Sequence, residues 1–210
     1  MLSEHDIRSA ATRAPGTFRD VFGVWAERTP NAPAFLTETG SALSFTEILT
    51  LIENIGVSLN DLGFGRGDRI AIIHPGGVDL AVAIVGIWSH ATAIPLAPNF
   101  RLGEYALYLR DLQVDAVAIA AGQIAPARAA AEHLGLPVLD LIPLDGDGSG
   151  HIRIAGRATA RPYNSRLTEP HELAAVLITS ATPPRRKFVP RRHSHLAPPA
   201  PHDAHLLHLT

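Results

Sequence analysis

The sequence predicts an α/β protein with a doubly wound, mostly parallel sheet and helices on both faces. Two observations carry this prediction. Short apolar runs rich in β-branched residues alternate along the chain with longer segments of helical periodicity. The connections between these segments are short, and such an alternation forms a parallel sheet that is covered on both sides.

Two helices and two short strands are expected before the sheet. Thr17 is placed to cap a helix with apolar residues along one face, namely Phe18, Val21, Phe22 and Trp25. Short strands are expected at 34–38 and 42–44. Ser44 and Glu47 then have the spacing of a capping box, which opens a second helix.

The sheet itself is predicted from residue 69 onward. Strands are expected at 69–73, 91–96, 114–120, 137–141 and 173–178. Helices are expected at 78–89, at 102–112 and from Pro126 to just before Gly135. Residues 143–172 are polar and contain proline and glycine, so we expect a surface excursion around one short strand, 151–154.

Composition limits the function classes. The 210 residues are 46% hydrophobic and 18% charged, and the formal net charge of −2 gives no global attraction to nucleic acid or an anionic membrane. The absence of cysteine excludes disulfides and thiolate metal sites. The N-terminus lacks the apolar core of a signal peptide, and the apolar segment 78–88 is too short to span a bilayer. We expect a cytoplasmic protein.

Three glycine-containing stretches have alternative interpretations. The stretch 63–68 precedes a strand, whereas a dinucleotide loop follows one, so a connecting loop is expected. Pro75-Gly76-Gly77 lies between a strand and a helix and could present N–H groups to an anion. The stretch 145–150 is similar to the start of a calcium loop, but its twelfth position is Gly156 instead of glutamate, so a flexible loop is expected.

The candidate site follows the strand 173–178. Thr179, Ser180 and Thr182 supply hydroxyl groups, and Lys187 is the only lysine in the chain. A hydroxyl-rich loop after a buried strand, with a cation behind it, is typical of nucleotide phosphate binding. We therefore take these four residues as candidate nucleotide-binding residues, and we assign no catalytic residue and no metal site.

Residues 183–210 differ in composition from the rest of the chain. They hold five of the eleven histidines and five of the eighteen basic residues. Metal binding by His193 and His195, or by His202, His205 and His208, lacks an acidic cluster that would complete a site. A nucleic-acid patch of basic residues has only Phe188 for stacking. We expect a partial domain at 17–182 and a poorly ordered tail at 183–210.

The order of elements resembles the N-terminal part of the adenylate-forming (AMP-binding) acyl-CoA synthetases and ligases. The matching stretches are TFRDVFGVWAERTPNAPAF, LSFTEIL, LGFGRGDRIAI, HPGGVDLAVAIVGIWSHATAIPLAPNF and LAAVLITSAT, followed by RKFVP and His193. In that family the loop TSGTTGxPKGV wraps the phosphates of ATP, and Thr179, Ser180, Thr182 and Lys187 match its hydroxyls and lysine. The resemblance implies ATP with Mg²⁺, a carboxylic-acid substrate, an acyl-adenylate intermediate and transfer to coenzyme A.

The loop also departs from the family pattern. Ala181 replaces a glycine, Pro183 and Pro184 replace threonine and glycine, and Arg186 and Phe188 replace the proline and glycine beside the lysine. Proline has no N–H, so two donors are lost, at a cost of about 1.5–3 kcal/mol for each charge-assisted hydrogen bond. We expect weak ATP binding or none.

The resemblance also implies a truncated, catalytically incomplete chain, because family members are more than twice as long. The change of composition after Thr182 favours a frame disruption as its origin. Two alternatives remain. One is a non-catalytic α/β module that associates through exposed apolar surface. The other, which we favour less, is a nucleic-acid binder with a basic tail.

Overall fold

The computed structural model describes residues 16–37, 40–122, 124–146, 148–160, 163–179 and 187–196. Its strands are β1 (Pro33–Leu36), β2 (Ala42–Ser44), β3 (Arg69–Ile73), β4 (Thr92–Leu96), β5 (Ala116–Ala120), β6 (Val138–Pro143), β7 (Ile152–Gly156), β8 (Leu173–Thr179) and β9 (Lys187–Arg192). Its helices are α2 (Phe18–Arg28), α3 (Phe45–Asp61), α4 (Gly77–His90), α5 (Leu102–Asp111), α6 (Ala125–His133) and α7 (His193–Leu196).

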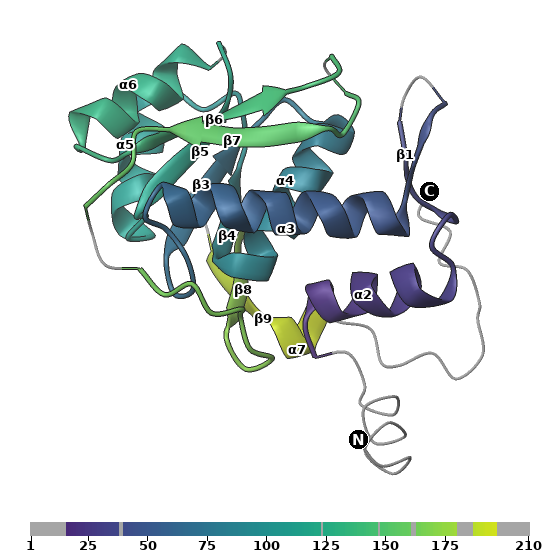
Figure 1. Ribbon diagram of the computed structural model, residues 1–210. Coiled ribbons are helices and arrows are strands. Elements are labelled where there is room, and N and C mark those ends of the chain that lie inside the picture. The colour runs from purple at the N-terminus through teal and green to yellow at the C-terminus, as the bar shows by residue number, and fades with distance from the viewer. Residues whose placement is uncertain are drawn as a thin grey trace.

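The predicted α/β fold with a mostly parallel sheet is confirmed (Figure 1). Within the described residues, seven strands form one sheet in the order β7-β6-β5-β3-β4-β8-β9, and β1 and β2 form a small separate hairpin. The five inner strands are parallel, whereas β7 and β9 pair antiparallel at the two edges. The seam between β4 and β8 is narrow, with the single register pair Ala93↔Ala175.

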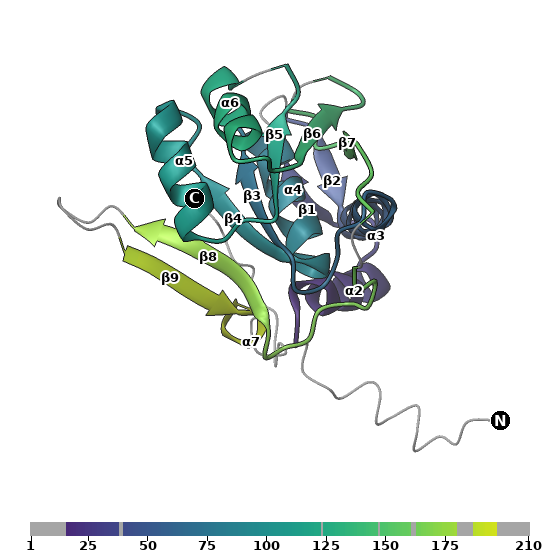
Figure 2. The same cartoon turned by 90° about the vertical axis from the view of Figure 1, so that its left-hand side faces the viewer.

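Helices cover both faces of the sheet (Figure 2). Alternate residues of a strand point to opposite faces. Ile70 and Ile72 therefore join the core beneath α2, α3 and α4, while Ala71 and Ile73 join the core beneath α5 and α6. Because both faces of β3 are buried from Ile70 to Ile73, this part of the strand is apolar without interruption, as expected for a parallel sheet.

Capping boxes begin the first two helices. The Thr17 hydroxyl accepts from the backbone N–H of Asp20, and the Asp20 carboxylate accepts from the Thr17 N–H. Ser44 and Glu47 make the same pair of contacts at the start of α3, as the sequence predicts. The two boxes satisfy backbone donors that a helix N-terminus otherwise leaves free.

Close packing between α3 and α4 depends on a glycine. A side chain at Gly86 of α4 would overlap Ile55 of α3, which is itself fully buried. The absent side chain therefore lets the two helices approach closely. Both helices belong to the layer that packs on the sheet face containing Ile70 and Ile72.

β9 and α7 lie within the stretch expected to be a poorly ordered tail. Phe188 of β9 is opposite Ile178 of β8, and Phe188 packs against Tyr108 of α5 with ring centroids 6.4 Å apart. This apolar contact fixes the strand to the sheet and corrects the expectation for residues 187–196. The expected boundary between Thr182 and Pro183, like residues 197–210, lies outside the described residues.

Candidate functional site

The carboxyl ends of the parallel strands form one edge of the sheet. The helix after β3, α4, packs on one face, whereas the helix after the adjacent strand β5, α6, packs on the other. This change of side is a topological switch point, and open α/β sheets bind ligands in the crevice outside the strand ends at such a point.

A cavity of about 430 Å³ lies at this switch point. The end of β3 and the first turn of α4 form one wall, and the ends of β5 and β6 form another. Its lining includes His74, Gly76, Gly77, Asp79, Ala121 and Gly148. Gly76-Gly77 was singled out from the sequence as a glycine pair between a strand and a helix, and so was the stretch 145–150 that contains Gly148, but the sequence did not predict that they share a cavity.

Asp79 fixes the loop between β6 and β7 to the first turn of α4. Its side chain is buried, and its two oxygens accept hydrogen bonds from Gly148 N at 2.7 Å and Gly150 N at 2.6 Å. The stretch that was expected to be a flexible loop is therefore anchored at these two amides. Sequence reasoning missed this role because Asp79 and Gly150 are 71 residues apart.

Gly76 and Gly77 bend the chain into α4. Their φ angles are 143° and 76°, a region that residues with side chains rarely adopt. Gly76 N donates to His74 Nδ1 at 3.2 Å. Gly76, the N-cap residue of α4, makes no side-chain cap. Anion binding by the amides of this turn stays a prediction.

The predicted phosphate-binding residues lie at the same edge, next to β4. Thr179 ends β8 and Lys187 begins β9, and the two residues are directly opposite in the antiparallel pair. The Thr179 hydroxyl donates to the Lys187 carbonyl oxygen at 3.4 Å, and both residues are exposed. Ser180 and Thr182 lie outside the described residues. The structure therefore brings two of the four candidate residues together at the mouth of a hairpin.

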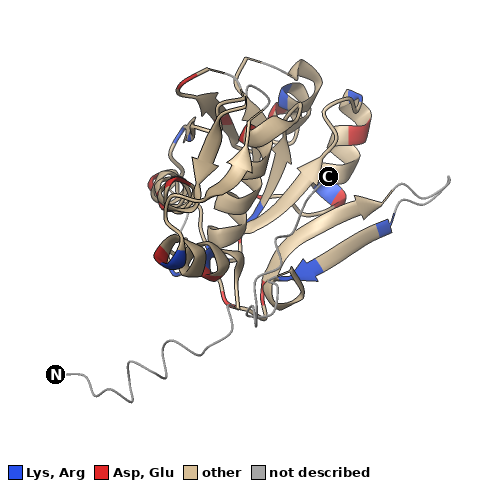
Figure 3. Ribbon diagram, turned by 90° about the vertical axis from the view of Figure 1, so that its right-hand side faces the viewer, with Lys and Arg blue, Asp and Glu red and all other residues tan. Residues whose placement is uncertain are grey.

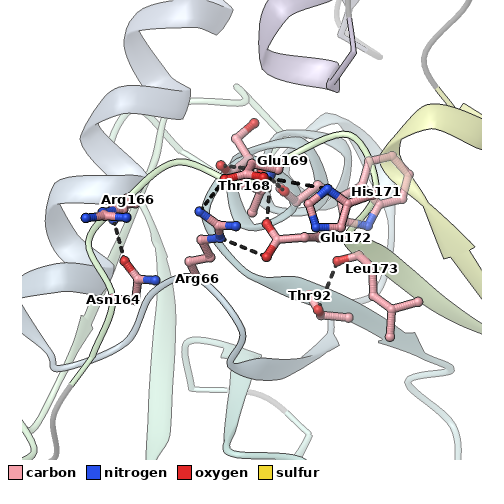
Figure 4. A network of polar contacts seen from close by, with 11 residues as sticks. Arg66, Thr92, Asn164, Arg166, Thr168, Glu169, His171, Glu172 and Leu173 are labelled. Atoms are coloured by element: carbon pink, nitrogen blue, oxygen red, sulfur yellow. Dashed lines mark hydrogen bonds and ion pairs between the residues drawn. The ribbon is translucent and has the colours of Figure 1, made fainter.

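The glycine-rich stretch 63–68 is a connecting loop, as expected. Gly65 N donates to Asp68 Oδ2 at 2.8 Å, and Arg66 N donates to Asn164 O at 2.8 Å. The Arg66 guanidinium forms ion pairs of 2.8 Å with Glu169 and Glu172 (Figure 4). Burial is the largest single influence on Glu172 and raises its pKa. The hydrogen bonds from Arg66 and the Glu169 N–H, together with the charges of Arg66 and His171, outweigh burial, so the pKa is lowered overall.

Three basic residues of the stretch 183–210 lie on β9. Lys187, Arg191 and Arg192 are exposed, and nucleic-acid binding through them stays a prediction. Figure 3 shows blue segments at both ends of this strand. His193, by contrast, is fully buried, and neither ring nitrogen has a hydrogen-bond partner among the described residues. Across those residues no group of three or more acidic or histidine side chains could hold a metal ion. His202, His205 and His208 lie outside them.

Exposed apolar side chains come from separate elements. Those on helices and strands are Leu36 of β1, Val57 of α3, Leu102 and Leu107 of α5, and Leu177 of β8. Their spread over the fold does not favour one association surface, and self-association stays a prediction. None of the helices in the described part of the chain has both the length and the apolarity that a membrane span requires.

Comparison with known proteins bears on the same residues. The sequence matches the family described as "AMP-binding enzyme" over residues 22–200. A phenyloxazoline synthase, MbtB of Mycolicibacterium paratuberculosis, is 29% identical over 83% of this chain and 14% of its own length. An oxalate–CoA ligase of Arabidopsis thaliana is 27% identical over 82% of this chain and 34% of its own length.

Solved structures give the same fold. A long-chain-fatty-acid–CoA ligase, FadD1 of Archaeoglobus fulgidus, superimposes with a TM-score of 0.67 at 18% identity, over 88% of this chain and 38% of that chain. VinN superimposes with a TM-score of 0.66 at 21% identity, over 87% of this chain and 45% of that chain. The chain spans 34% or less of the curated relatives named above.

Proposed function

The chain belongs to the AMP-binding enzyme family, and we propose that it supplies the phosphate-binding part of an adenylate-forming acyl-CoA ligase. The observation that carries the proposal is the β8–β9 hairpin at the carboxyl edge of the sheet. Thr179 and Lys187 are opposite each other at its mouth and flank the stretch that matches the ATP loop of the family.

The chemistry proposed for the whole enzyme has two steps. A carboxylate oxygen attacks the α-phosphorus of ATP, forming an acyl-adenylate while pyrophosphate leaves. The thiol of coenzyme A then attacks the acyl carbon, forming a thioester and releasing AMP. Among the relatives, one is a CoA ligase and another a phenyloxazoline synthase, so coenzyme A as the acceptor is part of the proposal.

The described residues fit a nucleotide phosphate in part. The exposed Thr179 hydroxyl and Lys187 ammonium lie where strands of an open sheet present groups to ligands. The described residues contain no group of three or more potential metal ligands, and in this proposal Mg²⁺ is bound together with ATP. Pro183 and Pro184 remove two N–H donors from the intervening loop, which favours millimolar affinity or weaker.

Restoring the loop tests this proposal. MgATP binding is measured by isothermal titration calorimetry on the full chain and on the triple variant Ala181→Gly, Pro183→Thr, Pro184→Gly. The full chain is expected to fall short of saturation at millimolar MgATP. The variant regains donors and glycines, so its affinity should rise at least about tenfold.

Lys187→Met in the restored background is the matched control, and it should cancel most of the gain. Circular dichroism shows whether each variant retains the fold. A restored variant that is folded but binds MgATP no better than the parent would overturn the assignment of this hairpin. Micromolar affinity in the parent would overturn the argument from the two prolines.

A further inference from the structure

A second cavity lies at the opposite edge of the sheet. It has a volume of about 650 Å³ and is bordered by the amino ends of β3, β4 and β8 and the end of β9. This size is within the range of small-molecule sites. From the first to the fifth residue of β4 the chain makes four steps of about 3.3 Å, so the two edges are roughly 13 Å apart. The cavity is therefore separate from the proposed ATP site.

Buried hydroxyl groups fix its walls. Thr92, at the start of β4, donates to the Leu173 carbonyl oxygen at 3.0 Å and ties β4 to β8 (Figure 4). Thr168 donates to the Ser89 carbonyl oxygen at 3.1 Å and ties the preceding loop to the end of α4. Both threonines are buried. These two bonds hold the strand ends and the preceding loop in place around the cavity.

Two arginines and two histidines line the cavity. Arg69 and Arg192 contribute two guanidinium groups, and His171 and His195 contribute two imidazoles. The acidic lining residue is Glu172, and its carboxylate is already paired with Arg66 at 2.8 Å. His171 Nδ1 lies 3.6 Å from Glu169 Oε2. An incoming anion would therefore meet the two guanidinium groups, whose charge the Glu172 carboxylate does not offset.

The two arginines are held differently. Arg69 Nη1 donates to the Leu112 carbonyl oxygen at 3.0 Å and to Gln113 Oε1 at 3.3 Å, which orients the guanidinium and leaves its remaining N–H groups available. Arg192 is exposed at the end of β9. A planar guanidinium binds a carboxylate or a phosphate with two parallel hydrogen bonds.

We propose that this cavity is a binding site for a small organic anion that carries a carboxylate or phosphate group. The head group binds Arg192, Arg69 and the two imidazoles. Ala91, Leu173 and Pro190 provide an apolar wall for the rest of the ligand. The site does not depend on the proposed ATP-binding function.

The test is an NMR titration of the full chain with inorganic phosphate and, separately, with glutarate, at constant ionic strength. The histidine ring signals are assigned with His171→Gln and His195→Gln. The signals of both rings should shift and saturate, with half-saturation of about 1–10 mM for at least one probe. The probe that binds more tightly identifies the preferred head group.

Arg192→Gln should raise the half-saturation concentration roughly tenfold. Arg191→Gln is the matched control, because Arg191 is the neighbouring exposed arginine of β9 and does not line the cavity. Lys187→Met should leave the titration unchanged, which separates this site from the ATP loop. Shifts that stay linear with both probes, or equal effects of the two arginine variants, would overturn the proposal.

Discussion

Acidification should destabilise the protein through His193. The imidazole is 0% exposed, neither ring nitrogen has a partner among the described residues, and burial lowers the pKa of His193 from 6.5 to about 4. Glu172 and Asp20 act in the opposite direction but do not compensate for burial. The folded protein therefore holds His193 neutral, whereas the unfolded chain takes up a proton below pH 6.5.

The direction and size of this pH effect follow from the linkage between proton binding and folding. The contribution of neutral His193 to the free energy of unfolding is fully present above pH 6.5. It declines as the pH falls from 6.5 towards 4, because in this range the unfolded state binds one more proton than the folded state, and the decline stops below pH 4. The difference between a pKa of 6.5 and one of about 4 corresponds to roughly 3 kcal/mol. By pH 5, about 2 kcal/mol of this should be lost.

Urea unfolding at pH 8, 7, 6 and 5, followed by tryptophan fluorescence, measures this loss. His193→Leu replaces the unpartnered ring with an apolar side chain, so it should raise stability at pH 5 relative to the parent and remove most of the slope. The difference between parent and variant cancels the contribution of His90, whose pKa is also lowered by burial. His195→Leu, on the exposed side of α7, is the control. An unchanged slope in His193→Leu would refute this account.

Three further changes test the packing. Gly86→Val should lower the free energy of unfolding by about 2 kcal/mol, because the new side chain overlaps Ile55. Gly23→Ala, at a helical site with open space around it, should raise the free energy of unfolding by roughly 0.5–1 kcal/mol. Thermal unfolding compares the two variants. Asp79→Ala leaves two loop amides without an acceptor and should cost about 3 kcal/mol in urea unfolding, with Asp79→Asn losing less. Arg66→Met removes two ion pairs and should speed amide exchange in residues 164–172 by up to about fivefold, while exchange in β5 stays unchanged.

Local patterns account for most of what the sequence predicts correctly. Helical periodicity and cap chemistry place α3, and apolar runs place the inner strands, because each signal lies within a few residues. β9 was not predicted from the sequence, because Pro190 and two arginines are not typical of a strand. The residues that could have indicated it are Phe188 and Val189, which pair with Ile178 and Leu177 of β8.

The features that the sequence does not predict are those formed by residues from distant parts of the chain. The cavity at the amino edge combines Arg69, Thr92, Glu172 and Arg192, which come from four separate segments. The opposition of Thr179 and Lys187 likewise depends on the hairpin and not on their spacing alone. Such juxtapositions follow from topology, so no local pattern predicts them.

The narrow seam between β4 and β8 has a consequence for the order of folding. Strands β3 to β7 and their helices lie within residues 69–156, whereas β8 must return to β4 across about eighty residues, with the single pair Ala93↔Ala175. Closing so long a loop is slow compared with local contacts. On the ribosome the edge of β4 stays open until residue 175 has emerged. We therefore expect the hairpin that carries the proposed ATP loop to dock last, on a scaffold already formed.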